Sequence, residues 1–339
     1  MSHHTSLSVN DAAPVTPGRQ GRRAFRRATN TGAAEQIISI NPSLQTQTVN
    51  NTMNTVHAND ATSSPHDCRT DYSRHARRGK RGGTFEWSNA SLNCVRGCIH
   101  DCPYCYRGHY MTVRRDLMDD WTTEQPDKIK FVIPADFDRD RHRIMFPTAH
   151  DITPAMLDHC LEALRQALVV RGLRVLIVSK PHMECITAIC ERFKDYKDQI
   201  LFRFTIGSDD DAILKAWEPN APCLAERMAC LRYAFEQGFA TSVSCEPMLD
   251  PPNIERHVAM LAPFVTDAVW VGKAKGLHAR MRMTRIEQVL MMATLEEQQS
   301  DDNIKAIYER LKGNPKVKWK ETIKEVVGLK LPTEAGQDQ

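Results

Sequence analysis

From Phe85 onward, short apolar runs alternate along the chain with longer amphipathic segments. Six runs have the length and composition of buried strands, and they lie at residues 85–92, 144–148, 173–179, 200–206, 239–245 and 267–272. Between them, apolar residues recur at the spacing of one helical face, as in Leu157, Leu161, Leu164 and Leu168 and in Leu224, Met228, Leu231 and Phe235. We interpret both helical sets as core positions.

Strands that alternate with helices favour a parallel sheet with right-handed crossovers. Six such units are too few for a closed eight-stranded barrel, so the pattern predicts an α/β fold, a partial (βα)6 TIM-type barrel with parallel strands. We expect this core domain at residues 83–280, with ligands at the carboxyl ends of the strands. Residues 281–339 carry amphipathic patterns, which predict a helical C-terminal extension.

Residues 1–82 are rich in polar residues and lack periodic apolar positions, which predicts a disordered N-terminal arm. Two basic runs stand out in it, namely Arg19, Arg22, Arg23, Arg26 and Arg27, and then Arg74, Arg77, Arg78, Lys80 and Arg81. The arm is either a solvated tail or a flexible segment that binds phosphate groups. The net charge of the whole chain is only +3, so nucleic-acid binding would depend on such local clusters.

The composition indicates a globular protein in a reducing compartment. Apolar residues make up 41% of the chain, and neither a signal peptide nor a run of 18 apolar residues is present, so we expect no membrane segment and a cytoplasmic location. Of eleven cysteines, four lie within twelve residues and the others are scattered. In a reducing cytosol, clustered cysteines suggest a metal and scattered ones suggest core packing.

The clustered cysteines are Cys94, Cys98, Cys102 and Cys105. One hypothesis is a structural zinc ion bound by all four thiolates, although such sites usually show two short pairs separated by a spacer. The other uses only Cys98, Cys102 and Cys105, which would leave one iron of a [4Fe–4S] cluster without a protein ligand. An open coordination position is typical of a catalytic metal site.

The run from Asn93 to Tyr106, NCVRGCIHDCPYCY, resembles the radical S-adenosylmethionine (radical SAM) superfamily, and within it the spore photoproduct lyase-like branch. Further similar stretches follow in the same order, at residues 148–151 (TAHD), 178–180 (VSK), 204–206 (FTI) and 218–227. The resemblance covers roughly residues 85–275. It implies a cluster whose open iron binds S-adenosylmethionine, reductive cleavage of that cofactor, and hydrogen abstraction from a substrate by the resulting 5′-deoxyadenosyl radical.

The resemblance also implies roles for single residues. Lys180 would neutralise the methionine carboxylate of the cofactor, and Tyr104 would lie against its adenine. Thr148 and Thr205 are candidate hydrogen-bond partners of the cofactor. Tyr106 stands where photoproduct lyases keep a tyrosine near the radical path. An external electron donor of the flavodoxin or ferredoxin type is expected to reduce the cluster.

Two positions depart from the branch. Cys94 stands where the branch usually has proline, as a packing residue, a redox-active neighbour or a helper in cluster loading. Pro147 stands where photoproduct lyases carry a hydrogen-donor cysteine, which weakens the case for repair of thymine lesions by that route. Cys245, at the end of the fifth predicted strand, is a candidate substitute donor, and its alternative role is packing.

Three functional hypotheses follow. The first is a radical SAM enzyme that acts on DNA, RNA or a nucleobase-like substrate. The second is radical SAM modification of a peptide or small molecule, although the subtype with auxiliary C-terminal clusters is disfavoured because no cysteine follows Cys245. The third is a zinc-stabilised nucleic-acid-binding module with Cys94 as the fourth ligand. The sequence predicts no oligomeric state.

Overall fold

A computed structural model describes residues 83–114, 116–281 and 286–337. Their strands form one sheet in the order β2-β1-β3-β4-β5-β6-β7-β8. From β3 to β8 all neighbours are parallel, β1 is parallel to β3, and β2 is antiparallel to β1 at the edge. The strands are β1 (Ser91–Arg96), β2 (Gln125–Val132), β3 (Ile144–Phe146), β4 (Val175–Ser179), β5 (Ile200–Thr205), β6 (Ala240–Cys245), β7 (Val269–Val271) and β8 (Val317–Trp319).

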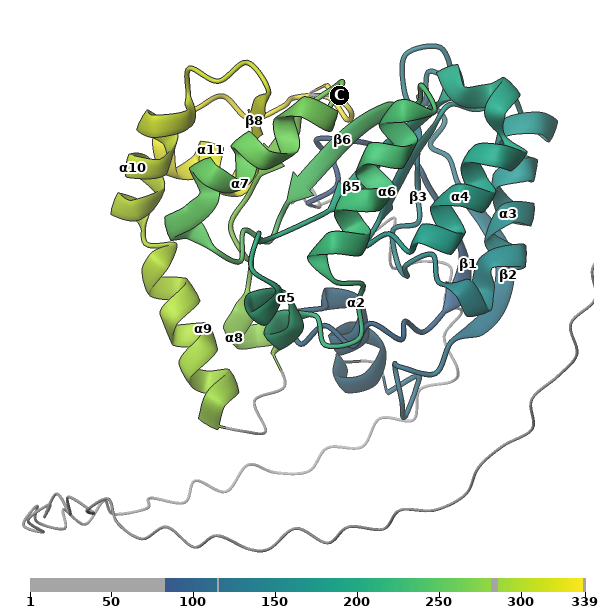
Figure 1. The fold of residues 1–339 in the computed structure, drawn as a ribbon. Helices are drawn as coiled ribbons and strands as arrows, with labels where there is room; N and C mark the ends of the chain where they lie inside the picture. Colours follow the sequence, from purple (N-terminus) through teal and green to yellow (C-terminus); the bar gives the residue numbers. More distant parts are fainter. Residues whose placement is uncertain (1–82, 115, 282–285, 338–339) are drawn as a thin grey trace, which may run out of the picture. The chain divides into compact units, whose positions relative to one another are not determined.

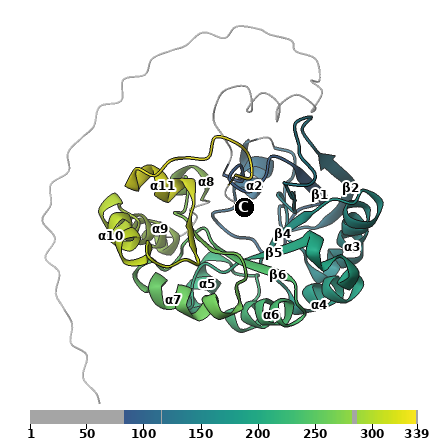
Figure 2. The same ribbon diagram turned by 90° about the horizontal axis from the view of Figure 1, so that it is seen from above.

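Helices connect most of the parallel strands and cover the outer face of the curved sheet, as Figure 2 shows for α3, α4, α6, α7 and α10. The smaller helices α2, α5 and α8 lie instead at one end of the sheet (Figure 1). The bounds are α2 (Tyr106–His109), α3 (Leu157–Arg165), α4 (Met183–Arg192), α5 (Asp211–Trp217), α6 (Leu224–Glu236), α7 (Ile254–Leu261), α8 (Leu277–Arg280), α9 (Ile286–Gln298), α10 (Asp301–Leu311) and α11 (Glu321–Val327). No helix of the described residues is long and apolar enough to cross a membrane.

Each strand sends alternate side chains to opposite faces of the sheet. One set packs under the helices in the main core, and it includes Phe146, Ile177, Phe202, Phe204, Val243 and Val271. The other set faces the concave side, where Met145, Leu176, Leu201 and Trp270 pack with Trp87. This parity decides which strand residues can meet a ligand inside the barrel.

Buried charges link the segment before β1 to the segment after β8. Lys320 Nζ lies 2.9 Å from Glu86 Oε2 and 3.9 Å from the centre of the Trp87 ring, and its side chain is fully buried. Lys324 Nζ donates to the other Glu86 oxygen at 3.0 Å. The two ends of the parallel sheet are therefore joined by paired, desolvated charges, which are costly to separate.

The structure confirms the predicted partial barrel of parallel strands and corrects it in three places. The strand predicted at 85–92 is wrong, because residues 83–87 form a turn that sends Trp87 into the concave face, and the first strand starts at Ser91. The antiparallel edge strand β2 was not predicted. Residues beyond 281 add the strand β8 to the expected helices. The predicted disordered arm, residues 1–82, lies outside the described residues, and the proposed domain boundaries stay predictions.

Candidate functional site

A tight loop after β1 carries Cys98, Cys102 and Cys105. Gly97 opens it with φ near +90°, and a Cβ there would meet the Thr123 carbonyl oxygen at 2.2 Å, so only glycine fits. The Cys98 amide donates to the Trp121 carbonyl at 2.8 Å. At the far end, Cys105 Sγ accepts the Gly108 amide at 3.3 Å and caps α2. The backbone is thus fixed on both sides of the three thiols.

The spacing of the three thiols bears on the two metal hypotheses. A single tetrahedral zinc holds its sulfurs about 2.3 Å away, which places them roughly 3.8 Å apart. Among the described residues, the three cysteine sulfurs do not form a group within 4.8 Å of one another. Thiolates on separate irons of one cluster lie farther apart. The group that does meet this limit is Cys98, His100 and Asp151, and three thiolates from one loop are a ligand set of the kind that holds a four-iron cluster.

Burial disfavours the ionised form of two of these thiols. Burial raises the pKa of the Cys98 thiol well above its usual range, and burial raises the pKa of Cys102 as well. The raised pKa values favour the protonated thiols of Cys98 and Cys102 when no cation is bound. Metal binding replaces that proton, because only the thiolate is a good ligand.

Cys94 belongs to a different environment. It lies within β1 and is 1% exposed, and its Sγ is 3.9 Å from Cys160 Sγ and 3.9 Å from His150 Nε2 in the core beneath the helices. The hypothesis that Cys94 supplies a fourth zinc ligand is therefore wrong, because its side chain leaves the strand on the helix-covered face. Its hydrogen bond with Cys160 lowers the pKa of Cys94 even though burial opposes this.

Asp151 joins the cysteine loop to the end of β4. Its Oδ1 accepts hydrogen bonds from Ser179 Oγ at 2.6 Å and from the Lys180 amide at 2.8 Å. Its Oδ2 lies 2.9 Å from His100 Nδ1 and 3.4 Å from Lys180 Nζ. Burial alone would raise the pKa of Asp151, but Lys180 and His100 outweigh it and hold that pKa well below its usual range. The predicted site residue Lys180 is thus a buried, charged neighbour of the loop.

Tyr104 is anchored at its hydroxyl. That group donates to Glu218, which also forms an ion pair at 2.5 Å with Arg227, and the side chains of Glu218 and Arg227 are fully buried. The Tyr104 ring lies 5.9 Å from Lys180 Nζ and 6.4 Å from the Trp217 ring. Tyr104 and Lys180, predicted from distant parts of the sequence, therefore lie together.

Thr148 and Tyr106 also meet. Tyr106 donates its hydroxyl proton to the Thr148 carbonyl at 2.7 Å, and its side chain is half exposed. Asn93 from β1 fixes the same turn, because its amide group donates to Thr148 Oγ1 at 2.8 Å and accepts the Thr148 amide at 2.9 Å. The Thr148 carbonyl therefore accepts from Tyr106, and the Thr148 hydroxyl oxygen accepts from Asn93.

Thr205 and Cys245 end adjacent strands but face opposite ways. Thr205 follows the parity of Leu201 and Arg203 on the concave side, and its carbonyl accepts from Arg227 at 3.3 Å. Cys245 follows the parity of Val243, is fully buried, and packs in the main core beneath the helices. The register therefore places Cys245 away from the concave side, where a donor to a bound substrate would have to lie.

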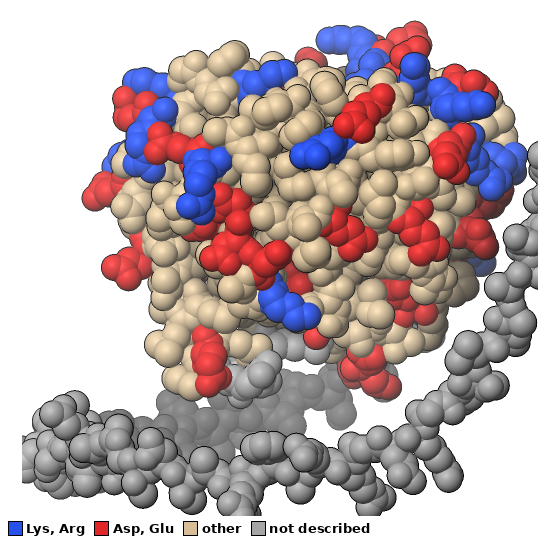
Figure 3. All heavy atoms as spheres, viewed as in Figure 1, with Lys and Arg blue, Asp and Glu red and all other residues tan. Residues whose placement is uncertain are grey.

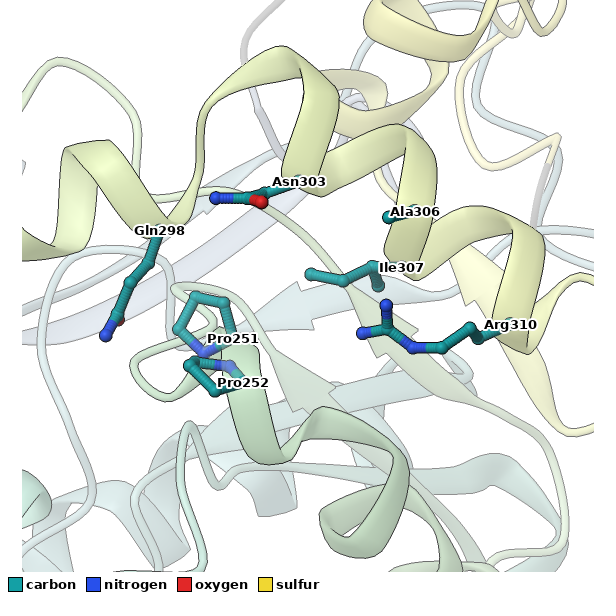
Figure 4. A pocket seen from close by; sticks show the side chains of 7 residues that line it. All are labelled: Pro251, Pro252, Gln298, Asn303, Ala306, Ile307 and Arg310. Atoms are coloured by element: carbon teal, nitrogen blue, oxygen red, sulfur yellow. The ribbon is translucent and has the colours of Figure 1, made fainter.

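A separate hollow lies between α10, the end of α9 and the segment before α7 (Figure 4). It encloses about 410 Å³, including open solvent, and is lined by Pro251, Pro252, Gln298, Asn303, Ala306, Ile307 and Arg310. Arg310 is already paired with Glu255 at 2.8 Å. None of the predicted site residues lines this hollow, so we place the functional site at the cysteine loop.

Sequence reasoning missed the residues that hold the site together, chiefly Asp151, His100, Asn93, Glu218 and Arg227. Asp151, Glu218 and Arg227 lie inside the motif stretches at 148–151 and 218–227, which was an available signal. No sequence pattern indicated a role for His100, although it lies between Cys98 and Cys102. Its side chain is fully buried, and its Nε2 lies 2.8 Å from His182 Nε2.

Comparisons with known proteins match the chain to one family and to several individual proteins. The family model described as the Radical SAM superfamily matches residues 92–262. A protein of Acidianus two-tailed virus, named Uncharacterized protein ORF301, is 25% identical over 240 residues, which cover 65% of this chain and 78% of that protein. Two solved structures of mutant spore photoproduct lyase match with 14% identity and TM-scores of 0.43, over 68% of this chain and 76% of theirs. One holds a dinucleoside spore photoproduct, and the other holds AdoMet as well.

Proposed function

This chain belongs to the radical SAM superfamily and is a radical SAM enzyme, and from that premise we propose the residues and the substrate class of its reaction. We propose that Cys98, Cys102 and Cys105 hold a [4Fe–4S] cluster and that the enzyme cleaves S-adenosylmethionine reductively. The observation that supports this proposal is the arrangement of three thiols on one loop whose backbone is fixed on both sides, in a chain that matches the Radical SAM family model.

When bound, the cluster and S-adenosylmethionine supply a carbon-centred radical that removes a hydrogen atom from the substrate. The protein's contribution is to bind and orient. Lys180 is the cation that would pair with the methionine carboxylate, since its side chain is only 13% exposed and lies beside the cysteine loop. Tyr104, fixed at its hydroxyl by Glu218, offers ring surface to the adenine. Thr205, on the concave side, is a proposed hydrogen-bond partner of the cofactor.

Tyr106 is the proposed catalytic residue. Its half-exposed ring stands beside the cysteine loop, and its hydroxyl is oriented by the Thr148 carbonyl. Cys245, the other candidate hydrogen donor, is disfavoured by its register. Members of the superfamily take their electron from an external donor, and we propose a protein of the flavodoxin or ferredoxin type for this role.

The proposed substrate is a nucleic acid or a nucleobase-like molecule. Its support is the sequence similarity of the cysteine run to the spore photoproduct lyase-like branch, together with the two basic runs in residues 1–82. Over the described residues, acidic and basic side chains are interspersed on the face drawn in Figure 3. We propose that binding to phosphate groups depends on the basic runs of residues 1–82. Pro147 argues against the lesion repair of photoproduct lyases by the same donor.

Deleting residues 1–82 tests the nucleic-acid part of the proposal. We expect affinity for single- or double-stranded DNA or RNA to fall roughly tenfold or more at low salt, with a shallower salt dependence, because eleven lysines and arginines are lost with the segment. Fluorescence anisotropy at several salt concentrations measures both quantities. Iron content of the same samples serves as the control and is expected to stay unchanged.

Unchanged affinity and salt dependence would contradict the role of the basic runs. The substrate itself is then sought by incubating the enzyme with deuterated nucleosides, oligonucleotides, peptides and small metabolites. Deuterium in the released 5′-deoxyadenosine identifies the substrate class. Transfer only from a peptide or small molecule would replace the nucleic-acid proposal with the alternative radical SAM modification.

A further inference from the structure

The environment of Lys180 shows an ammonium group that is held in place but not saturated. Its Nζ lies 3.4 Å from Asp151 Oδ2, and Asp151 is its only ion-pair partner among the described residues. The Tyr104 ring lies 5.9 Å away. An ammonium group has three N–H donors, so Lys180 keeps donors for a second anion.

Asp151, in contrast, is fully engaged. Its carboxylate makes three contacts that are shorter than the one to Lys180 Nζ. They are with Ser179 Oγ, the Lys180 amide and His100 Nδ1. His100 is in turn 2.8 Å from His182 at the start of α4. The carboxylate therefore cannot swing toward the ligand or follow Lys180 outward. Asp151 is therefore a fixed, buried negative charge, and its position determines where the Lys180 ammonium lies.

The same Asp151 oxygen that faces Lys180 Nζ lies 4.0 Å from Cys98 Sγ. One atom thus links the ammonium to the first cysteine of the loop. From these contacts we infer that Asp151 is a positioning residue, which holds the Lys180 ammonium beside Cys98 so that it recognises the carboxylate of S-adenosylmethionine. This inference rests on the proposed function, because it takes Lys180 as the carboxylate partner.

The test compares two cofactors that differ only in that carboxylate. Equilibrium dialysis on the anaerobically reconstituted full-length protein gives dissociation constants for S-adenosylmethionine and for decarboxylated S-adenosylmethionine, each normalised to iron content. In Asp151→Asn, asparagine keeps the size of the side chain and can still accept the Lys180 amide, but it removes the countercharge. We expect S-adenosylmethionine to bind about ten- to a hundredfold more weakly, the effect of losing a charged hydrogen bond, and the decarboxylated form within twofold of wild type.

Two further variants separate the possible explanations. Asp267→Asn breaks another ion pair, in which the buried Arg203 lies 3.0 Å from the half-buried Asp267, and is expected to change neither constant. Lys180→Met is expected to abolish the preference for the carboxylate, and adding Asp151→Asn to it should have no further effect.

Equal weakening for both cofactors in Asp151→Asn would overturn the inference. A second outcome would also overturn the inference. If Asp151→Asn loses iron but its iron-loaded fraction still prefers S-adenosylmethionine over the decarboxylated form, Asp151 stabilises the cysteine loop and does not position Lys180. If wild type binds neither cofactor, or if Lys180→Met keeps full preference for the carboxylate, the proposed function fails instead.

Discussion

Replacing Cys98, Cys102 or Cys105 with alanine is expected to abolish iron–sulfur loading, from about four irons per chain to nearly none. Each of these cysteines lies on a loop whose backbone is fixed at both ends, so no neighbouring thiol can move in to replace a lost ligand. Iron and sulfide analysis after anaerobic reconstitution, with the visible absorbance of the cluster, measures the result.

Cys94→Ala is the matched control, since it removes a thiol only four residues before Cys98. Cys94 faces the core beside Cys160, so this variant is expected to load iron as wild type does. Full loading of any of the three loop variants, or loss of iron from Cys94→Ala alone, would show that the ligand set is assigned wrongly.

Replacing Arg227 with methionine should produce the second large effect. Arg227 and Glu218 are both fully buried, and removing the guanidinium leaves a carboxylate with no countercharge. Breaking one side of such a pair typically costs about 3–5 kcal/mol of unfolding free energy. The same carboxylate holds the Tyr104 hydroxyl, so the loss should extend to the cysteine loop. Guanidinium denaturation at matched iron content measures the change in unfolding free energy.

The exposed pair Arg165–Glu162 supplies the comparison, because Arg165→Met removes a pair in contact with solvent and should leave the denaturation midpoint almost unchanged. The double variant Glu218→Leu and Arg227→Met should recover much of the loss, since it buries no unpaired charge. If Arg227→Met is no more destabilising than Arg165→Met, the buried pair is not an anchor of the site.

Sequence reasoning succeeded where a pattern is local. The spacing of three cysteines identified the loop, and the apolar runs at 200–206 and 239–245 lie within one residue of β5 and β6 at each end. It failed where the element is short or polar. The strand β8 has only three residues, and β2 alternates exposed and half-buried positions at the sheet edge with Pro126 near its start.

The face on which a residue lies was harder to predict than its place in a strand. Cys245 and Thr205 both end apolar strands, and strands buried on both faces carry no alternation that would reveal their parity. Only the register of the sheet separates them. Asp151 and Glu218 were missed for a similar reason, since their partners come from separate parts of the chain that tertiary folding brings together. These parts are the cysteine loop (His100 and Tyr104), the end of β4 (Lys180) and helix α6 (Arg227).

The most direct test of the central claim is the release of 5′-deoxyadenosine by the full-length protein after anaerobic reconstitution. With dithionite and S-adenosylmethionine present, chromatography should detect 5′-deoxyadenosine and methionine in equal amounts. Neither should form without reductant, nor in Cys98→Ala, Cys102→Ala or Cys105→Ala, while Cys94→Ala should behave as wild type. A protein that carries one tightly held zinc ion, takes up no iron and releases no 5′-deoxyadenosine would contradict the account.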